Sequence, residues 1–130
     1  MTDWVKDIHD MHAHYGMHEK FAEFDEQKKM LFLTFRANFL QEELDELKEN
    51  ISNPEEVVDA LIDLCVVAIG TLDAFGVDSH KAWKEVLRAN MNKQVGVKEG
   101  RPNPLNLPDL TKPEGWQPPS HTDNHGNLPK

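Results

Sequence analysis

The fold of this chain is decided by residues 39–63, FLQEELDELKENISNPEEVVDALID, which hold two groups of carboxylates on either side of a short break. In the first group, Glu43 and Glu46 are three residues apart, so both side chains lie on one face of a helix. In the second group, Asp59 and Asp63 are four residues apart. If the two helices form an antiparallel hairpin, the four acids meet at one place.

Asp63 is the most informative of these acids, because it lies inside the apolar run VVDALIDLCVVAI. Apolar residues surround it on nearly every side of a helix, and a charge in such a place costs several kcal/mol unless something pairs with it. No lysine or arginine is expected among the four acids, so a divalent cation is the expected counter-charge. The remaining acids of the first helix, Glu42, Asp45 and Glu49, are expected to be solvated.

Length and charge restrict the class of protein. A chain of 130 residues predicts one domain, and its net charge of −9 argues against a nucleic-acid partner and against an anionic membrane surface. A nucleotide substrate remains possible, since bound metal inverts the local field. The single cysteine, Cys65, excludes a disulfide framework within the chain. No basic and apolar leader opens the sequence and no apolar run is long enough to span a bilayer, so we expect a soluble, cytoplasmic protein.

Apolar periodicity and capping residues predict an all-α fold, a four-helix bundle completed by oligomerisation. Four helices are expected: one capped by Thr2 that ends near Gly16, one capped by Asp25 over 26–50, one from the Asn53-Pro54 start to about Phe75, and one capped by Asp78 that ends near Val95. The third helix is apolar nearly all round, which predicts that it is the central and most buried one. Gly70 within it allows close approach of another helix or subunit.

The character of the chain changes after Gly96. The tail holds seven of the eight prolines and few large apolar groups, which indicates an extended or disordered segment. We therefore divide the chain into a helical domain, 1–96, and a C-terminal arm, 97–130. Four residues of the arm are spaced like anchors on a folded surface, and an arm that crosses to a second subunit is the preferred interpretation: Leu105, Leu107, Leu110 and Trp116.

Four histidines lie near the N-terminus: His9, His12, His14 and His18. Histidines at spacings of three and four residues along a helix can bind a transition metal. A polar helix face with ordinary imidazoles explains the same pattern, and we favour it, because neither a second cysteine nor an HExxH motif supports zinc.

Carboxylates on two facing helices suit a hard cation with oxygen ligands, Mg²⁺ or Mn²⁺. A zinc site would need histidine or cysteine among the acids, and a di-iron site usually adds a Glu-x-x-His motif, which is absent here. Such a cation neutralises phosphate oxygens and lowers the pKa of a bound water. The predicted reaction is hydrolysis of a phosphoanhydride, with Glu42 or Glu46 available to orient the water.

The pattern Glu42-Glu43-x-x-Glu46, followed by acids on an apolar helix, resembles the MazG-like all-α nucleoside triphosphate pyrophosphohydrolases. The phrases DALIDLCVVAIGTLDAFGVD, RANMNK and KPEGWQPP are most similar to the small, phage-type members. The resemblance implies that Glu43, Glu46 and Asp63 are catalytic and bind Mg²⁺. The superfamily's second motif is commonly ExxD, but Ala60 stands three residues before Asp63, so the fourth ligand is Asp59 or, in another registration, Glu56.

The resemblance also implies the reaction and the assembly. Water attacks the α–β phosphoanhydride of a (d)NTP or a related nucleotide, releasing the monophosphate and pyrophosphate, and the subunits form a homodimer or a dimer of dimers. Candidate substrate-binding residues are Arg36, Asn90, Lys93 and Trp116, with Trp83 as a second candidate for stacking on a base. Four of these five residues have an ordinary alternative: an ion pair for Arg36, the helix dipole for Lys93, and packing for both tryptophans. Two rival functions remain, a phosphoribosyl-ATP pyrophosphohydrolase and a non-catalytic helical module that senses nucleotides.

Overall fold

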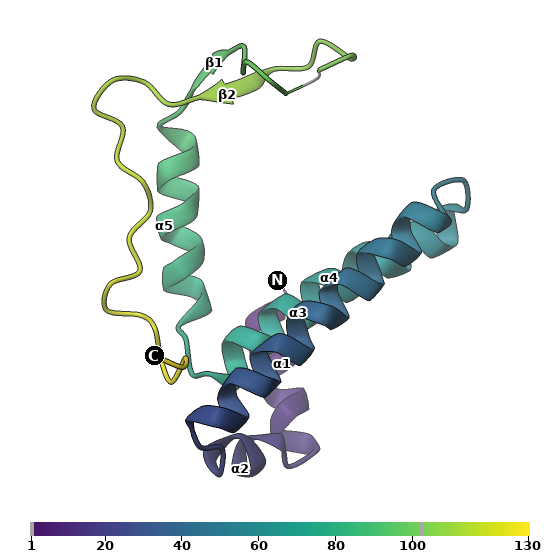
Figure 1. The fold of residues 1–130 in the computed structure, drawn as a ribbon, viewed down its shortest axis with the longest axis vertical. Coiled ribbons are helices and arrows are strands. Elements are labelled where there is room, and N and C mark those ends of the chain that lie inside the picture. The colour runs from purple at the N-terminus through teal and green to yellow at the C-terminus, as the bar shows by residue number, and fades with distance from the viewer. Residues whose placement is uncertain (1, 102) are drawn as a thin grey trace. The chain divides into compact units, whose positions relative to one another are not determined.

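In the computed structural model, the described residues are 2–101 and 103–130, and within them the chain forms five helices and one two-stranded antiparallel sheet (Figure 1). The elements are α1 (Trp4–His14), α2 (Met17–Ala22), α3 (Glu26–Glu49), α4 (Pro54–Ala74), α5 (Ser79–Met91), β1 (Gln94–Gly96) and β2 (Asp109–Thr111). The all-α prediction is confirmed. The small sheet was not predicted, because strands of three residues are too short to show alternation.

The chain divides into two compact units. The first comprises Met1–Ser79 together with Asn124–Lys130, and the second comprises His80–Asp123. The division drawn from the sequence, a helical domain of residues 1–96 and an arm of residues 97–130, stays a prediction.

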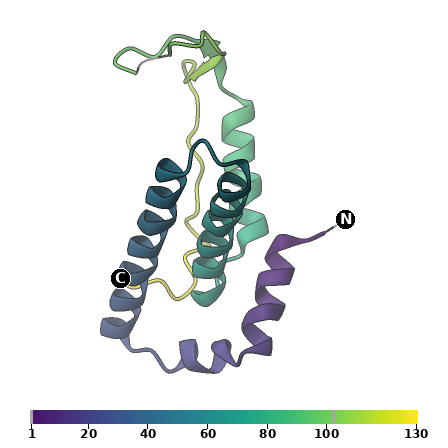
Figure 2. The ribbon, with the colours of Figure 1, turned by 90° about the vertical axis from the view of Figure 1, so that its right-hand side faces the viewer.

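The first unit is built on the hairpin of α3 and α4, which pack against each other (Figure 2). Asp25 caps α3, its side chain accepting a hydrogen bond of 2.8 Å from the backbone N–H of Lys28. Asn53 caps α4 in the same way, and Pro54 occupies the first turn. Both helix starts were predicted, and together they fix the hairpin that brings the two acidic groups face to face.

The helices α1 and α2 pack against α4 and against each other. The cap of α1 is Asp3, which accepts from the N–H of Lys6, and not the predicted Thr2. Gly16 ends the first helical segment with a φ of 68°, a left-handed conformation that glycine adopts without strain. The chain then restarts at once as α2, a helix that was not predicted because six residues give almost no periodic signal.

Helix α4 contacts α1, α2 and α3, as expected for a central helix. Its buried residues are Ala60, Val67 and Gly70. The predicted close approach at Gly70 is made within the chain: a Cβ there would lie 2.7 Å from the Arg36 guanidinium and 3.5 Å from the His12 ring. The opposite side of α4 is open in the single chain, where Leu61 is 47% exposed.

The C-terminal residues return to the first unit at the turn after α4. The buried Asn124 side chain accepts from the backbone N–H of Asp78 and donates to its carbonyl, both at 2.8 Å. The N–H of Asn127 donates to the carbonyl of Phe75 at 2.6 Å. Three hydrogen bonds therefore hold this segment on the backbone between α4 and α5.

In the second unit, α5 ends at Met91 and not near Val95, because the chain enters β1, where Val95 pairs with Leu110 of β2. After β2 the tail runs back along α5. The Trp116 indole N–H donates to the carbonyl of Ala89 at 2.7 Å, and the N–H of Ser120 donates to the Glu85 carboxylate at 3.1 Å. The tail is extended, as predicted; crossing to a second subunit stays a prediction.

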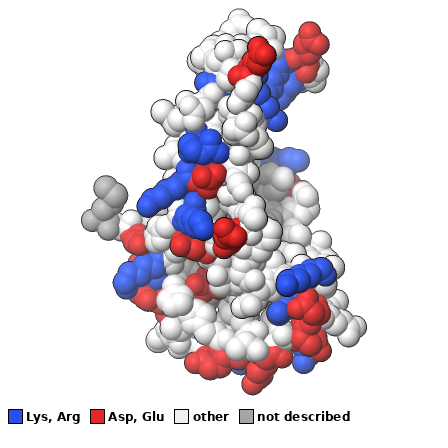
Figure 3. Space-filling view, turned by 90° about the vertical axis from the view of Figure 1, so that its left-hand side faces the viewer, with Lys and Arg blue, Asp and Glu red and all other residues white. Residues whose placement is uncertain are grey.

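Within the described ranges, no single helix combines the length and apolar character needed to cross a membrane. On the face drawn in Figure 3, lysine and arginine side chains are intermixed with aspartate and glutamate side chains.

Candidate active site in the helical hairpin

Glu43 is the buried residue of α3, although it is a glutamate on a helix that also carries leucines and phenylalanines. Its exposed fraction is 9%, and in the described part of the chain its Oε2 atom is buried without a hydrogen-bond partner. A buried, unpartnered carboxylate oxygen is costly, so native proteins seldom keep one without a counter-ion or another ligand.

The other predicted acids lie close to Glu43. Burial raises the pKa of Glu43, and the negative charges of Glu46, Asp63 and Asp59 raise that pKa further. The hairpin thus brings together the predicted acids of α3 and α4. The sequence pointed to Asp63 as the acid in the driest place; in the structure Asp63 is half-buried and Glu43 is the more buried of the two.

This arrangement fits a divalent cation by its donor set. All four side chains offer oxygen, which Mg²⁺ and Mn²⁺ prefer, and their mutual repulsion disappears when a cation is bound. Glu46 and Asp59 are exposed, so one side of the cluster is open to solvent and to a substrate. Glu56 is exposed in the first turn of α4, where its charge complements the helix dipole.

Arg36 lies two turns before Glu43 on α3, about 10 Å along the helix axis. Its Nε donates to Thr71 Oγ1 and its Nη2 donates to the Val67 carbonyl, both at 3.0 Å. The guanidinium also lies over the ring of Phe32. Burial lowers the pKa of Arg36. Among the described residues its hydrogen-bond partners are neutral, so the ordinary alternative of an ion pair with a neighbouring acid is not what the structure shows.

The remaining candidates, Asn90, Lys93 and Trp116, belong to the second unit. The ammonium groups of Lys93 and Lys112 lie 5.5 and 5.1 Å from the centroid of the Trp116 ring, which is a cation–π arrangement. Trp83 is 70% exposed. The role of these residues in substrate binding stays a prediction.

A second cluster consists of histidines that were noted in the sequence and an aspartate that was not. Of the four N-terminal histidines, His9, His12 and His18 each form a hydrogen bond with Asp73 near the end of α4. Asp73 was not among the residues selected from the sequence. The signal that would have found it is a further acid on the apolar helix, ten residues after Asp63.

One family model matches the chain, that of phosphoribosyl-ATP pyrophosphohydrolase (PRA-PH), over residues 15–90. The match covers more than half of the chain and contains all four acids and Arg36. The search of the curated proteins found no match, and neither did the search of the solved structures. The hairpin geometry and the family match agree with the resemblance drawn from the acidic motif. The chain therefore belongs to the phosphoribosyl-ATP pyrophosphohydrolase family, within the MazG-like all-α pyrophosphohydrolase superfamily.

Proposed function

We propose that this protein is a Mg²⁺-dependent nucleotide pyrophosphohydrolase that cleaves the α–β phosphoanhydride of a (d)NTP or a related nucleotide. The products are the nucleoside monophosphate and pyrophosphate. The observation that carries the proposal is the buried Glu43 carboxylate with three acids around it, whose Oε2 atom has no hydrogen-bond partner among the described residues. The family match supports the coarser statement that the chain is a pyrophosphohydrolase.

In this proposal the cation is held by Glu43, Glu46, Asp59 and Asp63. Mg²⁺, or Mn²⁺ in its place, would neutralise phosphate oxygens and lower the pKa of a bound water. Asp59 is preferred to Glu56 as the fourth member, because Asp59 is one of the charges that raise the pKa of Glu43.

The chain's own residues have separate tasks. Glu43 is fixed by burial in the hairpin and sets the position of the cluster. The exposed carboxylates of Glu42 and Glu46 face solvent and are available to orient a water and to accept its proton. Among the described residues, Arg36 uses two of its five N–H groups, which leaves the others to donate to a substrate phosphate.

The experiment that tests this function is a panel of ribo- and deoxynucleoside triphosphates, with phosphoribosyl-ATP included, in Mg²⁺ or Mn²⁺. Release of pyrophosphate and a monophosphate supports the proposal, whereas release of orthophosphate contradicts it. Turnover of phosphoribosyl-ATP alone would favour the rival that bears the family's name. Binding of nucleotide and metal without turnover of any substrate would favour a nucleotide-sensing module.

Replacement of Arg36 by methionine is expected to raise KM by about 10- to 100-fold, the value of one charge-assisted hydrogen bond to phosphate. The fold should survive, because Thr71 Oγ1 also donates to the Val67 carbonyl at 2.7 Å and keeps that acceptor paired. Steady-state kinetics measure the change. Lys28→Met, at an exposed position of the same helix, is the control. An unchanged KM in Arg36→Met would remove Arg36 from the substrate site.

The open apolar side of the hairpin supports oligomerisation, as a homodimer or a dimer of dimers. Leu31 and Phe35 of α3 are 64% and 61% exposed, and Val58, Leu61 and Ile62 form a similar stripe on α4. Contiguous apolar side chains of this kind usually mark an interface. Light scattering of the purified chain should give at least twice the monomer mass of 14.9 kDa. A monomer at micromolar concentration would contradict this.

A further inference from the structure

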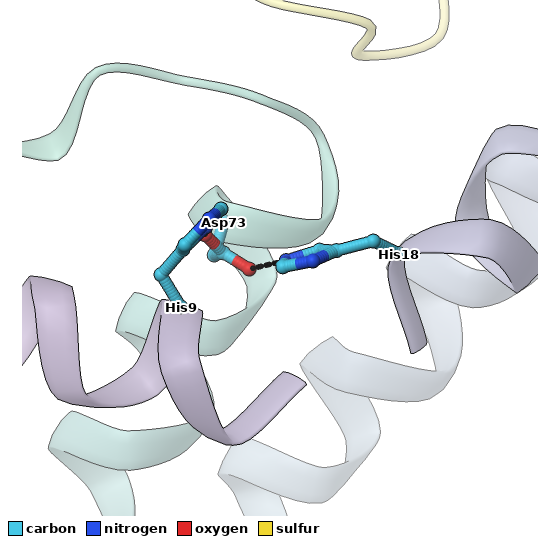
Figure 4. Close-up of side chains that lie close together, drawn as sticks. All are labelled: His9, His18 and Asp73. Atoms are coloured by element: carbon cyan, nitrogen blue, oxygen red, sulfur yellow. Dashed lines mark hydrogen bonds and ion pairs between the residues drawn. The ribbon is translucent and has the colours of Figure 1, made fainter. Parts of the chain in front are cut away.

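The geometry points to a second metal site, formed by His9, His18 and Asp73, that takes a divalent transition-metal ion of the zinc class. The three side chains come from α1, α2 and α4 and point toward one another, as Figure 4 shows. All three helices belong to the first unit. His9 lies before the residues that match the family model, whereas His18 and Asp73 lie within them. None of the three is among the four acids of the hairpin.

The distances suit a small ion. His9 Nδ1 lies 2.8 Å from Asp73 Oδ1, and His18 Nε2 lies 3.0 Å from Asp73 Oδ2. One ligand atom from each residue falls within 4.8 Å of the other two. Around a tetrahedral zinc ion, with bonds of about 2.0–2.2 Å, ligand atoms lie about 3.3 Å apart. The two nitrogen–oxygen distances are shorter than this spacing by a few tenths of an ångström, so each imidazole would move back slightly from the carboxylate oxygen that it contacts.

His12 completes the arrangement from the protein side. Its Nδ1 lies 2.7 Å from Asp73 Oδ2, and both side chains are about nine-tenths buried. A carboxylate ligand is usually held in place by such an outer hydrogen bond. The His12 ring makes an edge-on contact with Phe21 of α2, and it lies so close to α4 that a Cβ added at Gly70 would touch it. His12 is thus a positioning residue for Asp73.

The donor set separates this site from the one in the hairpin. Two imidazole nitrogens with one carboxylate suit zinc, cobalt or nickel, whereas the four acids around Glu43 suit magnesium. The His9 side chain is 59% exposed and that of His18 is 30% exposed, so an ion can enter from solvent and keep a water. Because the ligands join three helices, the bound ion would tie α1 and α2 to α4.

The alternative is a purely structural network, in which three imidazoles donate hydrogen bonds to Asp73 and no metal binds. The two differ in metal uptake. Titration of the full chain, without an affinity tag, with Zn²⁺ should show one saturable site per chain, and the melting temperature should rise by several degrees at about 100 times Kd. Co²⁺ in place of Zn²⁺ should give visible absorption bands of a nitrogen- and oxygen-ligated ion.

Variants assign the site. His9→Gln and Asp73→Asn should each weaken Zn²⁺ binding by about 100-fold or more, and His12→Gln by about 10- to 100-fold, the effect of an outer-shell partner. His14→Gln is the matched control, because His14 lies on the same helix as His9 and is exposed. Since His9 is the most exposed ligand, His9→Gln tests the site even if Asp73→Asn fails to fold.

A wild-type chain that takes up no Zn²⁺ would overturn the inference, and so would a His9→Gln variant that binds Zn²⁺ as tightly as the wild type. Zn²⁺ uptake that persists in His9→Gln and disappears in Glu43→Gln would assign the ion to the hairpin acids and overturn it as well. The outcome is independent of the proposed function, because a protein without pyrophosphohydrolase activity can still bind Zn²⁺ at these three residues.

Discussion

Replacement of Glu43 by glutamine is expected to lower turnover by about 10²- to 10⁴-fold while raising the melting temperature of the metal-free protein. Stabilisation of transition-state charge by a bound cation is worth several kcal/mol, and each 1.36 kcal/mol is tenfold in rate. Stability should rise because burial and the neighbouring acids make the Glu43 charge unfavourable without a cation. Pyrophosphate release measures the first effect and thermal unfolding in a chelator measures the second.

Addition of Mg²⁺ distinguishes the metal-free state of this site from the metal-bound state. Mg²⁺ should raise the melting temperature of the wild type and leave that of Glu43→Gln nearly unchanged. Glu49→Gln, at an exposed position on the same helix, should resemble the wild type in both measurements. Asp63→Ala should lose activity in the same way as Glu43→Gln. Full activity in either variant would exclude that residue as a ligand.

Replacement of Gly126 by alanine is expected to detach the C-terminal segment and to lower the free energy of unfolding by about 2–3 kcal/mol. A Cβ at this position would overlap the carbonyl oxygen of Phe75 and would lie 2.9 Å from the carbonyl carbon of Gly76. Both are backbone atoms that cannot move aside, so the segment must leave. Its three hydrogen bonds to the turn are then lost, at about 1 kcal/mol each. Chemical denaturation and hydrogen exchange of the Asp78 amide measure the loss.

Gly115→Ala is the matched control for this experiment. Gly115 also has a positive φ, 77°, but a Cβ there meets nothing within 4 Å. Gly115→Ala should therefore lower the free energy of unfolding only by the backbone strain of a left-handed alanine, about 1 kcal/mol. If Gly126→Ala is no more destabilising than Gly115→Ala, the steric contact with Phe75 is not what fixes the segment.

The helices that carry the acids were predictable because capping residues in the sequence mark where each helix begins. Asp25 before α3 and Asn53-Pro54 before α4 satisfy the free N–H groups of the first turn, and both positions were confirmed as caps. Elements of a few residues were not predictable. Helix α2 depends on the left-handed Gly16 before it, and the two strands depend on pairing between residues 15 positions apart, such as Val95 and Leu110.

For the candidate site, sequence spacing identified which acids share a face, but not which of them is driest. Asp63 has apolar neighbours along its own helix, whereas the burial of Glu43 comes from packing of α3 against α4. The Asp73 cluster was hidden for a similar reason. Its three histidines are 55 to 64 residues away in the chain, and only the packing of α1 and α2 on α4 brings them to it.

Because Asn124 is hydrogen-bonded to the backbone of Asp78, the chain leaves the first unit and returns to it at the same place. The segment between them, residues 79–123, therefore has its two ends held together by hydrogen bonds. Such a layout lets that stretch change in length or composition over evolution without disturbing the carboxylates of the hairpin, and it marks Asp78 and Asn124 as the natural splice points for grafting a foreign loop.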